Sequence, residues 1–168
     1  LLIFRLTWGF VGSRTARFSS FVKGPATVLS HVGLLLQKKN GKPYLGHNPL
    51  GGWSIVAMLL VLFVQVATGL FANDDILTEG PLYTWVSKEA SDFLTWIHLI
   101  NRFVFIALIA IHILAVFFYF FFKHENLIGP MITGMKRWPA ATKTTAGSNL
   151  LAAAIFGMAI LAVYLLVR

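Results

Sequence analysis

The chain has 168 residues, of which 57% are hydrophobic, and a formal net charge of +8 from 14 Lys and Arg against six Asp and Glu. Its apolar residues fall in long runs and not in alternating strand patterns, which excludes an ordinary soluble domain and predicts an all-α integral membrane helical bundle. The sequence has no cysteine, and this excludes disulfides, thiolate metal sites, iron–sulfur clusters and covalent c-type haem attachment. With this hydropathy, the excess of basic residues indicates cytoplasmic loops and not nucleic-acid binding.

The chain begins with an apolar segment, residues 1–11, that lacks the basic region and the cleavage site of a signal peptide. We interpret it as the last turns of a helix whose beginning is not in this sequence. The next apolar pattern starts at Pro25, a residue that suits a first helical turn, and ends at lysines. It predicts a helix lying on the cytoplasmic leaflet. Its apolar face would consist of Val28, Leu29, Val32, Leu35 and Leu36.

Three later stretches are long and apolar enough to cross a bilayer as helices: residues 52–72, 93–122 and 149–167. The first of them would be about 31 Å long at 1.5 Å per residue, which matches the thickness of a hydrocarbon core. The second is longer and would tilt or protrude.

The loops between these stretches alternate in charge. Residues 12–47 carry six Lys and Arg and no acid, residues 73–92 carry five acids and one Lys, and residues 123–147 carry four Lys and Arg and one acid. For a multi-pass protein of a bacterial inner membrane, the positive-inside rule therefore places the first and third loops on the cytoplasmic side and the second on the periplasmic side. No span has to be inverted.

The second span carries two histidines, His98 and His112, fourteen residues apart. At 100° per residue this spacing falls about 40° short of four turns, so both side chains share one face, with a rise of about 21 Å between them. One metal cannot bridge that distance, but two b-type haems can each take one imidazole, since such a haem needs only axial ligands and an apolar slot. The alternative is that both histidines hydrogen-bond to neighbouring helices.

Three further residues are candidates for haem binding. Arg102 lies one turn from His98 and can pair with a haem propionate, although an interhelical hydrogen bond or a tilt towards water would also explain it. Arg5 can serve similarly on the cytoplasmic side, or it can be an anchor at a helix end. Gly69, in the preceding span, has no side chain and would let a porphyrin approach.

The remaining histidines carry weaker signals. His31 lies on the predicted interfacial helix and His47 at the start of a span, and both fit the membrane interface better than metal ligation. His47 is also a candidate neighbour of a quinone pocket. His124 follows a lysine and is expected to be solvated.

Five segments carry a family resemblance: "FRLTWGFVGSRTARFSSFVKGP", "YLGHNPLGGW", "TGLFANDDI" with "EGPL", the helix with two histidines, and "KHENLIGPMITGMK". Together they run from residue 4 to residue 136 and resemble the bacterial cytochrome b561 family of di-haem membrane cytochromes b, which includes b subunits of nickel–iron hydrogenases.

The resemblance implies a four-helix core that binds two b haems, with His98 and His112 each paired with a histidine of the first or second helix. The first helix and most of the second, with their two histidines, are absent. Either the N-terminal part is missing from this sequence or the haems are incomplete; we expect the former, with the partner ligands outside this sequence. Residues 1–123 would form the core, 124–148 a cytoplasmic loop and 149–168 an extra C-terminal transmembrane helix.

The implied activity is electron transfer between the quinone pool and a periplasmic or membrane redox partner, as a subunit of a membrane oxidoreductase and without a catalytic residue of its own. The resemblance does not assign the quinone site. The acidic loop, with Asp74, Asp75 and Glu79, would either dock a basic partner such as a c-type cytochrome or only enforce topology. Membrane lipid is an expected partner, and a homodimer is compatible. The alternative function is a non-catalytic anchor or assembly subunit of a larger complex.

Overall fold

The computed structural model describes residues 1–37, 44–136 and 147–168. Residues 38–43 and 137–146 lie outside it, and with them the predicted cytoplasmic charges at Lys38, Lys39, Lys42, Arg137 and Lys143. The described parts are helical, with one isolated antiparallel bridge between Asn73 and Glu79. The all-α membrane fold class is confirmed. The elements in chain order are α1 (Leu2–Val11), η1 (Arg14–Ala16), α2 (Phe18–Phe21), α3 (Pro25–Leu36), α4 (Pro49–Gly69), η2 (Tyr83–Trp85), α5 (Lys88–Phe122), α6 (Ile128–Thr133) and α7 (Asn149–Leu166).

Within the described ranges, α4, α5 and α7 are the three helices long and apolar enough to cross a membrane. Their starts differ from the predicted ones because polar caps precede the apolar runs. The side chain of Asn48 accepts a hydrogen bond from the backbone of Gly51 at 2.7 Å, and Pro49 fills the first helical position, so α4 begins three residues early. Ser87 caps α5 in the same way, so α5 gains a polar turn before the predicted start at residue 93.

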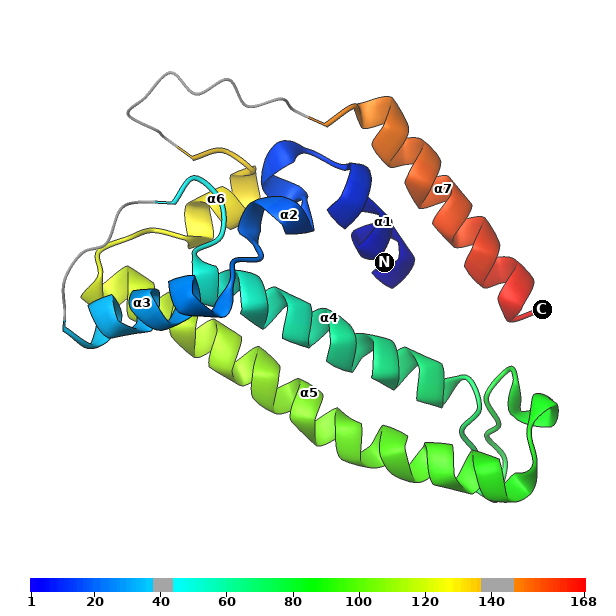
Figure 1. Cartoon of the computed structure of the whole chain (residues 1–168). Coiled ribbons are helices and arrows are strands. Elements are labelled where there is room, and N and C mark those ends of the chain that lie inside the picture. Colours follow the sequence, from blue (N-terminus) through cyan, green and yellow to red (C-terminus); the bar gives the residue numbers. More distant parts are fainter. Residues whose placement is uncertain (38–43, 137–146) are drawn as a thin grey trace.

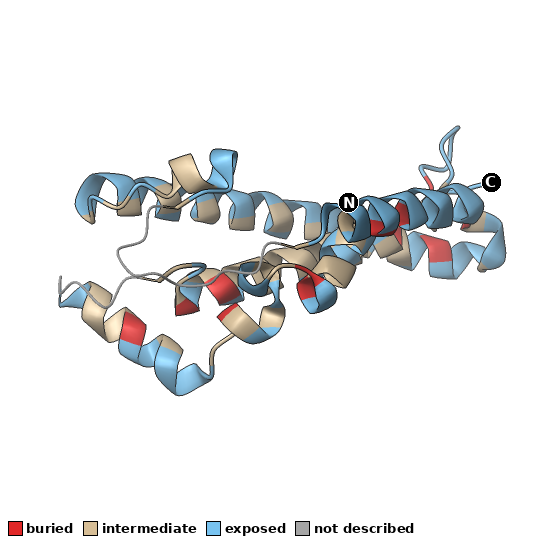
Figure 2. Cartoon of the chain, turned by 90° about the horizontal axis from the view of Figure 1, so that it is seen from above, coloured by how far each residue is buried: buried red, intermediate tan, exposed pale blue. Residues whose placement is uncertain are grey.

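The two long helices α4 and α5 form an antiparallel pair, joined at one end by the loop of residues 70–87 (Figure 1). The small helices α2, α3 and α6 gather at the other end of the pair (Figure 1). Figure 2 shows that buried positions are few and that most of the helix surface is open. Such apolar exposed surface suits contact with lipid or with further helices.

At the end of the pair opposite the loop, α2 packs tightly onto the start of α4. A Cβ on Gly52 would lie 2.5 Å from the carbonyl oxygen of Phe21, so only glycine allows this approach. Phe21 itself is buried, and the indole of Trp53 donates to the carbonyl of Lys23 at 2.8 Å. These contacts fix where the chain enters α3.

Helix α3 forms as predicted, and Val28, Val32 and Leu35 of its predicted apolar face are half-buried. His31 is buried, whereas Leu29 and Leu36 of the predicted apolar face are exposed. The ring of His31 hydrogen-bonds to Tyr119 of α5, and the expected place of this helix at the membrane interface stays a prediction. The exposed leucines remain available to the bilayer.

Helix α1 packs on α7 and also touches α4. The rings of Phe4 and Phe156 meet edge to face with 5.9 Å between centroids, an arrangement that aromatic pairs prefer. Gly147 admits the indole of Trp8, since a Cβ there would lie 2.6 Å from that ring. The first and last helices are thus neighbours.

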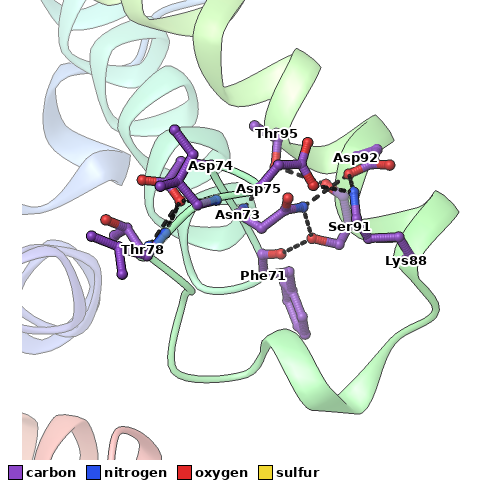
Figure 3. Close-up of polar contacts among 11 residues, drawn as sticks. Phe71, Asn73, Asp74, Asp75, Thr78, Lys88, Ser91, Asp92 and Thr95 are labelled. Atoms are coloured by element: carbon purple, nitrogen blue, oxygen red, sulfur yellow. Dashed lines mark hydrogen bonds and ion pairs between the residues drawn. The ribbon is translucent and has the colours of Figure 1, made fainter.

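The loop between α4 and α5 is held by a polar network (Figure 3). The amide of Asn73 donates to Ser91 Oγ at 2.6 Å and to Asp92 Oδ1 at 3.0 Å, and Ser91 Oγ donates to the carbonyl of Phe71 at 2.6 Å. Asp74 accepts three backbone hydrogen bonds from residues 76–78 at 2.8–3.0 Å, and these lower the pKa of its carboxyl group. The loop is therefore ordered by its own acidic and amide side chains.

Candidate functional site

His98 and His112 lie on the face of α5 that is turned towards the rest of the chain. Both are partly buried, and so are Phe105 and Tyr119, which follow the same seven-residue spacing. A spacing of seven residues returns to nearly the same helix face. The predicted shared face of the two histidines is therefore confirmed, with a separation of about 21 Å along the helix.

The imidazole of His98 is held by the end of α4. Its Nδ1 lies 3.0 Å from the backbone carbonyl oxygen of Gln65 and 3.2 Å from Oγ1 of Thr68. Its Nε2 lies 2.9 Å from the side-chain amide nitrogen of Gln65. The sequence analysis missed Gln65 and Thr68, although both are polar residues at bilayer depth, a signal that by itself marks a functional candidate.

Gly69 makes room for the same imidazole ring. A Cβ at this position would lie 2.9 Å from His98 Cε1 and 3.2 Å from Nδ1, closer than side chains pack. The sequence analysis expected Gly69 to admit a porphyrin. In the structure the ring of His98 lies beside it, so Gly69 contacts the candidate ligand, and its role towards a porphyrin stays a prediction.

His112 lies close to two basic residues near the opposite end of the pair. His47 keeps much of its surface exposed, yet the pKa of its imidazole is lowered, mainly by desolvation and further by the charges of His112 and Arg5. Arg5 and His112 therefore both lie within electrostatic range of His47, and the three residues form a loose basic cluster. The structure thus brings together the two predicted residues and a third, His47, that the sequence associated only with a quinone pocket.

Arg102 is exposed, and its guanidinium lies over the ring of the adjacent Phe103, 4.9 Å from the centroid. It lies one turn from His98, but this contact keeps it on the outer side of α5. Its role towards a propionate stays a prediction. His124 is exposed, as expected, and has a positive φ of 52°.

The donor set fits a haem better than a bare metal ion. Within the described residues no group of three or more His, Cys, Asp or Glu is arranged to hold a metal ion. A haem brings four nitrogen ligands in its own ring and needs only an axial imidazole at each depth. A carbonyl at the Nδ1 of His98 is also the partner that metal-binding histidines commonly have.

An all-α membrane chain with imidazoles at two depths of one helix defines the class of membrane b-type cytochromes. The comparison of sequences makes the assignment specific. A family model of the prokaryotic cytochrome b561 matches residues 1–134, so the chain belongs to this family. No curated protein and no solved structure matches it.

Membership confirms the resemblance found in the sequence. It assigns membrane electron transfer by a b-type cytochrome, with haem b as the cofactor. Helix α7 lies beyond the matched residues.

Proposed function

We propose that the chain supplies one axial imidazole to each of two b haems, His98 to the haem on the periplasmic side and His112 to the haem on the cytoplasmic side. The observation that carries this proposal is the placement of both imidazoles on one inward face of α5, fourteen residues apart. Bound haem supplies a reversible one-electron Fe(III)/Fe(II) couple. The residues of this chain hold the imidazoles at two depths and keep their surroundings apolar.

The cytoplasmic end would exchange electrons with a quinone. The cluster of Arg5, His47 and His112 supports this, because it combines a candidate haem ligand with basic groups on a partly exposed rim. Histidine can donate or accept a proton near neutral pH, and quinone reduction takes up protons together with electrons. Arg5 would pair with a propionate of this haem, as the sequence suggested.

The periplasmic end would face a redox partner with a basic surface, such as a c-type cytochrome or another oxidoreductase subunit. Two of the acidic residues in the loop already have partners within the chain. Asp74 binds backbone amides, and Asp75 pairs with Lys88 at 2.5 Å. Glu79 is exposed and remains available for docking. A partner would therefore be steered by the charge of the whole loop and not by one strong pair.

A second candidate is a structural subunit without haem, in which the histidines pack helices. The hydrogen bonds of His98 to Gln65 and Thr68 favour it, since such bonds join membrane helices. This candidate predicts that the purified protein is colourless, with no haem absorption bands.

The decisive experiment is a pyridine haemochrome assay on the full-length native protein purified from membranes, with His98→Ala and His112→Ala variants. We expect two b haems per chain, and each variant should lose one and keep the other. Phe105→Ala, between the two histidines on the same face, is the matched control and should retain both. A colourless native protein, or variants that keep both haems, would support the structural subunit.

A further inference from the structure

Four polar side chains meet between α4 and α5 at the depth of His98. Gln65 and Thr68 contact the imidazole and Asn101 contacts Gln65, and each of the three is buried or half-buried in an otherwise apolar stretch. Polar groups at bilayer depth are costly and need partners. Three polar side chains linked by hydrogen bonds to a candidate ligand call for a specific role.

The hydrogen bonds of Asn101 fix the orientation of the Gln65 amide. Asn101 Nδ2 donates to Gln65 Oε1 at 2.7 Å and to the carbonyl oxygen of Val61 at 2.9 Å. The oxygen of Gln65 is therefore the acceptor that faces Asn101, and its amide nitrogen faces His98. Since an amide nitrogen only donates, His98 Nε2 accepts this bond and carries a lone pair.

The other ring nitrogen is fixed from the opposite side. The backbone carbonyl of Gln65 can only accept, so His98 Nδ1 donates to it at 3.0 Å. Thr68 Oγ1 lies 2.7 Å from the carbonyl oxygen of Val64, to which it gives its proton, and so it too faces Nδ1 as an acceptor at 3.2 Å. The Gln65 amide nitrogen also lies 3.3 Å from Nδ1, but this contact is longer than the 2.9 Å to Nε2 and the 3.0 Å from Nδ1 to the carbonyl oxygen. The shortest contact at each ring nitrogen therefore specifies the same tautomer, with the proton on Nδ1.

We propose that Gln65, Thr68 and Asn101 are positioning residues that hold His98 in the tautomer which binds haem iron through Nε2; this rests on the proposed ligation by His98. A hydrogen bond from Nδ1–H to a carbonyl or hydroxyl oxygen orients a metal-bound imidazole and raises its basicity. A more basic ligand stabilises the ferric state, so the network lowers the reduction potential of this haem. In this structure the Gln65 amide hydrogen-bonds to Nε2, and it would have to move aside for Nε2 to hold haem iron.

The network is specific to one histidine. Within the described residues, His112 has no hydrogen bond of this kind, and the charged group shown within electrostatic range of it is His47. Substitutions in the network should therefore change the haem of His98 and leave the haem of His112 as it is. The second haem serves as an internal reference for folding and haem supply.

The test is a redox titration of the purified holoprotein, followed in the haem α band, together with the electron paramagnetic resonance spectrum of the ferric haems. Thr68→Val removes one acceptor of Nδ1–H at nearly constant volume. We expect it to shift the equilibrium of this haem towards the ferrous state by up to about tenfold, which is 59 mV for a one-electron couple. Gln65→Leu removes the Nε2 donor and the acceptor of Asn101, and should lower occupancy of this haem.

Thr68→Ser keeps the hydroxyl group and should keep the native potential. Ser54→Ala, on the same helix and about four turns away, is the matched control for losing a hydroxyl group. If Thr68→Val and Gln65→Leu leave the potential, spectrum and occupancy of this haem unchanged while His98→Ala removes it, the positioning role is wrong. An equal shift in Thr68→Ser and Thr68→Val would overturn it too. If His98→Ala removes no haem, the proposed ligation itself fails.

Discussion

His31 and Tyr119 lie 88 residues apart in the sequence and share a hydrogen bond of 3.1 Å between Nε2 and Oη. The histidine is 7% exposed, its Nδ1 is buried without a partner among the described residues, and the ring of Tyr44 meets it edge to face at 5.7 Å. This single bond ties α3 to α5, two turns beyond His112 on the same helix face. The predicted interfacial helix, which packs on α4, is thus also joined by a polar contact to the helix that carries both candidate ligands.

Tyr119→Phe should destabilise the protein by about 1–3 kcal/mol, because it leaves both ring nitrogens of the buried His31 without a partner. Replacing both residues, in His31→Phe with Tyr119→Phe, should recover part of this loss, since two apolar partners carry no unsatisfied group. Thermal unfolding in detergent measures both. Tyr164→Phe, an exposed tyrosine on α7, is the control. Equal midpoints for Tyr119→Phe and the native protein would show that the bond adds nothing to stability.

Stability should also fall when the pH drops from about 7 to 5. Burial lowers the pKa of His31 below its usual 6.5, and the nearby charge of Lys123 lowers it further. In the window between the lowered value and 6.5, the unfolded chain binds more protons than the folded one, so the free energy of unfolding rises with pH there and declines as the solution is acidified. Unfolding midpoints at several pH values measure the slope.

The pKa of His47 is lowered too, so the contributions of His31 and His47 to this pH dependence have to be measured one at a time. His31→Gln and His47→Gln should each flatten part of the slope between pH 7 and 5, and the double variant should remove most of it. Asp74 contributes in a lower pH range. The backbone hydrogen bonds that lower the pKa of its carboxyl group stabilise the fold above about pH 4, and this stabilisation is lost on further acidification. An unchanged slope in the double variant would contradict the assignment.

The spans and the shared face of His98 and His112 were predictable because they depend on local periodicity. Hydrophobic run length fixes a transmembrane helix, and a fourteen-residue spacing fixes a face whatever surrounds it. The helix starts were less accurate, since the caps at Asn48 and Ser87 lie outside the apolar runs. Local patterns thus gave the helices but not their polar ends.

The partners of these histidines could not be read in this way. Which residues of α4 meet His98 depends on how two helices are rotated about their axes, and Gln65 is 33 residues away in the sequence. His31 shows the same limit, because its partner Tyr119 becomes adjacent only after α3 folds back over α5. The polar character of Gln65 within an apolar span was the available signal, and it identifies a candidate without naming its contact.

Gly69→Ala should disturb the haem assigned to His98. The new methyl group would lie 2.9 Å from Cε1 of the imidazole, so the ring or the helix must shift by a few tenths of an ångström. We expect reduced occupancy or a shifted α band for that haem in the purified holoprotein, with the His112 haem unaffected. Gly157→Ala is the matched control, because nothing lies within 4 Å of a Cβ there. If both alanine variants have native spectra, the contact between Gly69 and the ring has no role in haem binding.

Asn73→Ala should loosen the loop that joins α4 and α5. Asn73 is 8% exposed and donates to Ser91 and Asp92, so its loss removes two bonds that tie the loop to the first turns of α5 (Figure 3). The expected cost is about 1–2 kcal/mol, the lower part of the usual range, because the buried Oδ1 of Asn73 already lacks a partner among the described residues. Hydrogen exchange of residues 70–87 should become faster.

Asn73→Asp should be worse than Asn73→Ala at neutral pH, since it would place a second carboxylate beside Asp92 in place of a donor. Acidification should reduce the difference between the two variants as the new carboxylate takes up a proton. Asp75→Asn is the matched control: it removes only an exposed ion pair with Lys88, and asparagine tolerates the φ of 58° at this position, so a change within about 0.5 kcal/mol is expected. Faster exchange in Asp75→Asn than in Asn73→Ala would mean that the ion pair, and not the buried amide, holds the loop.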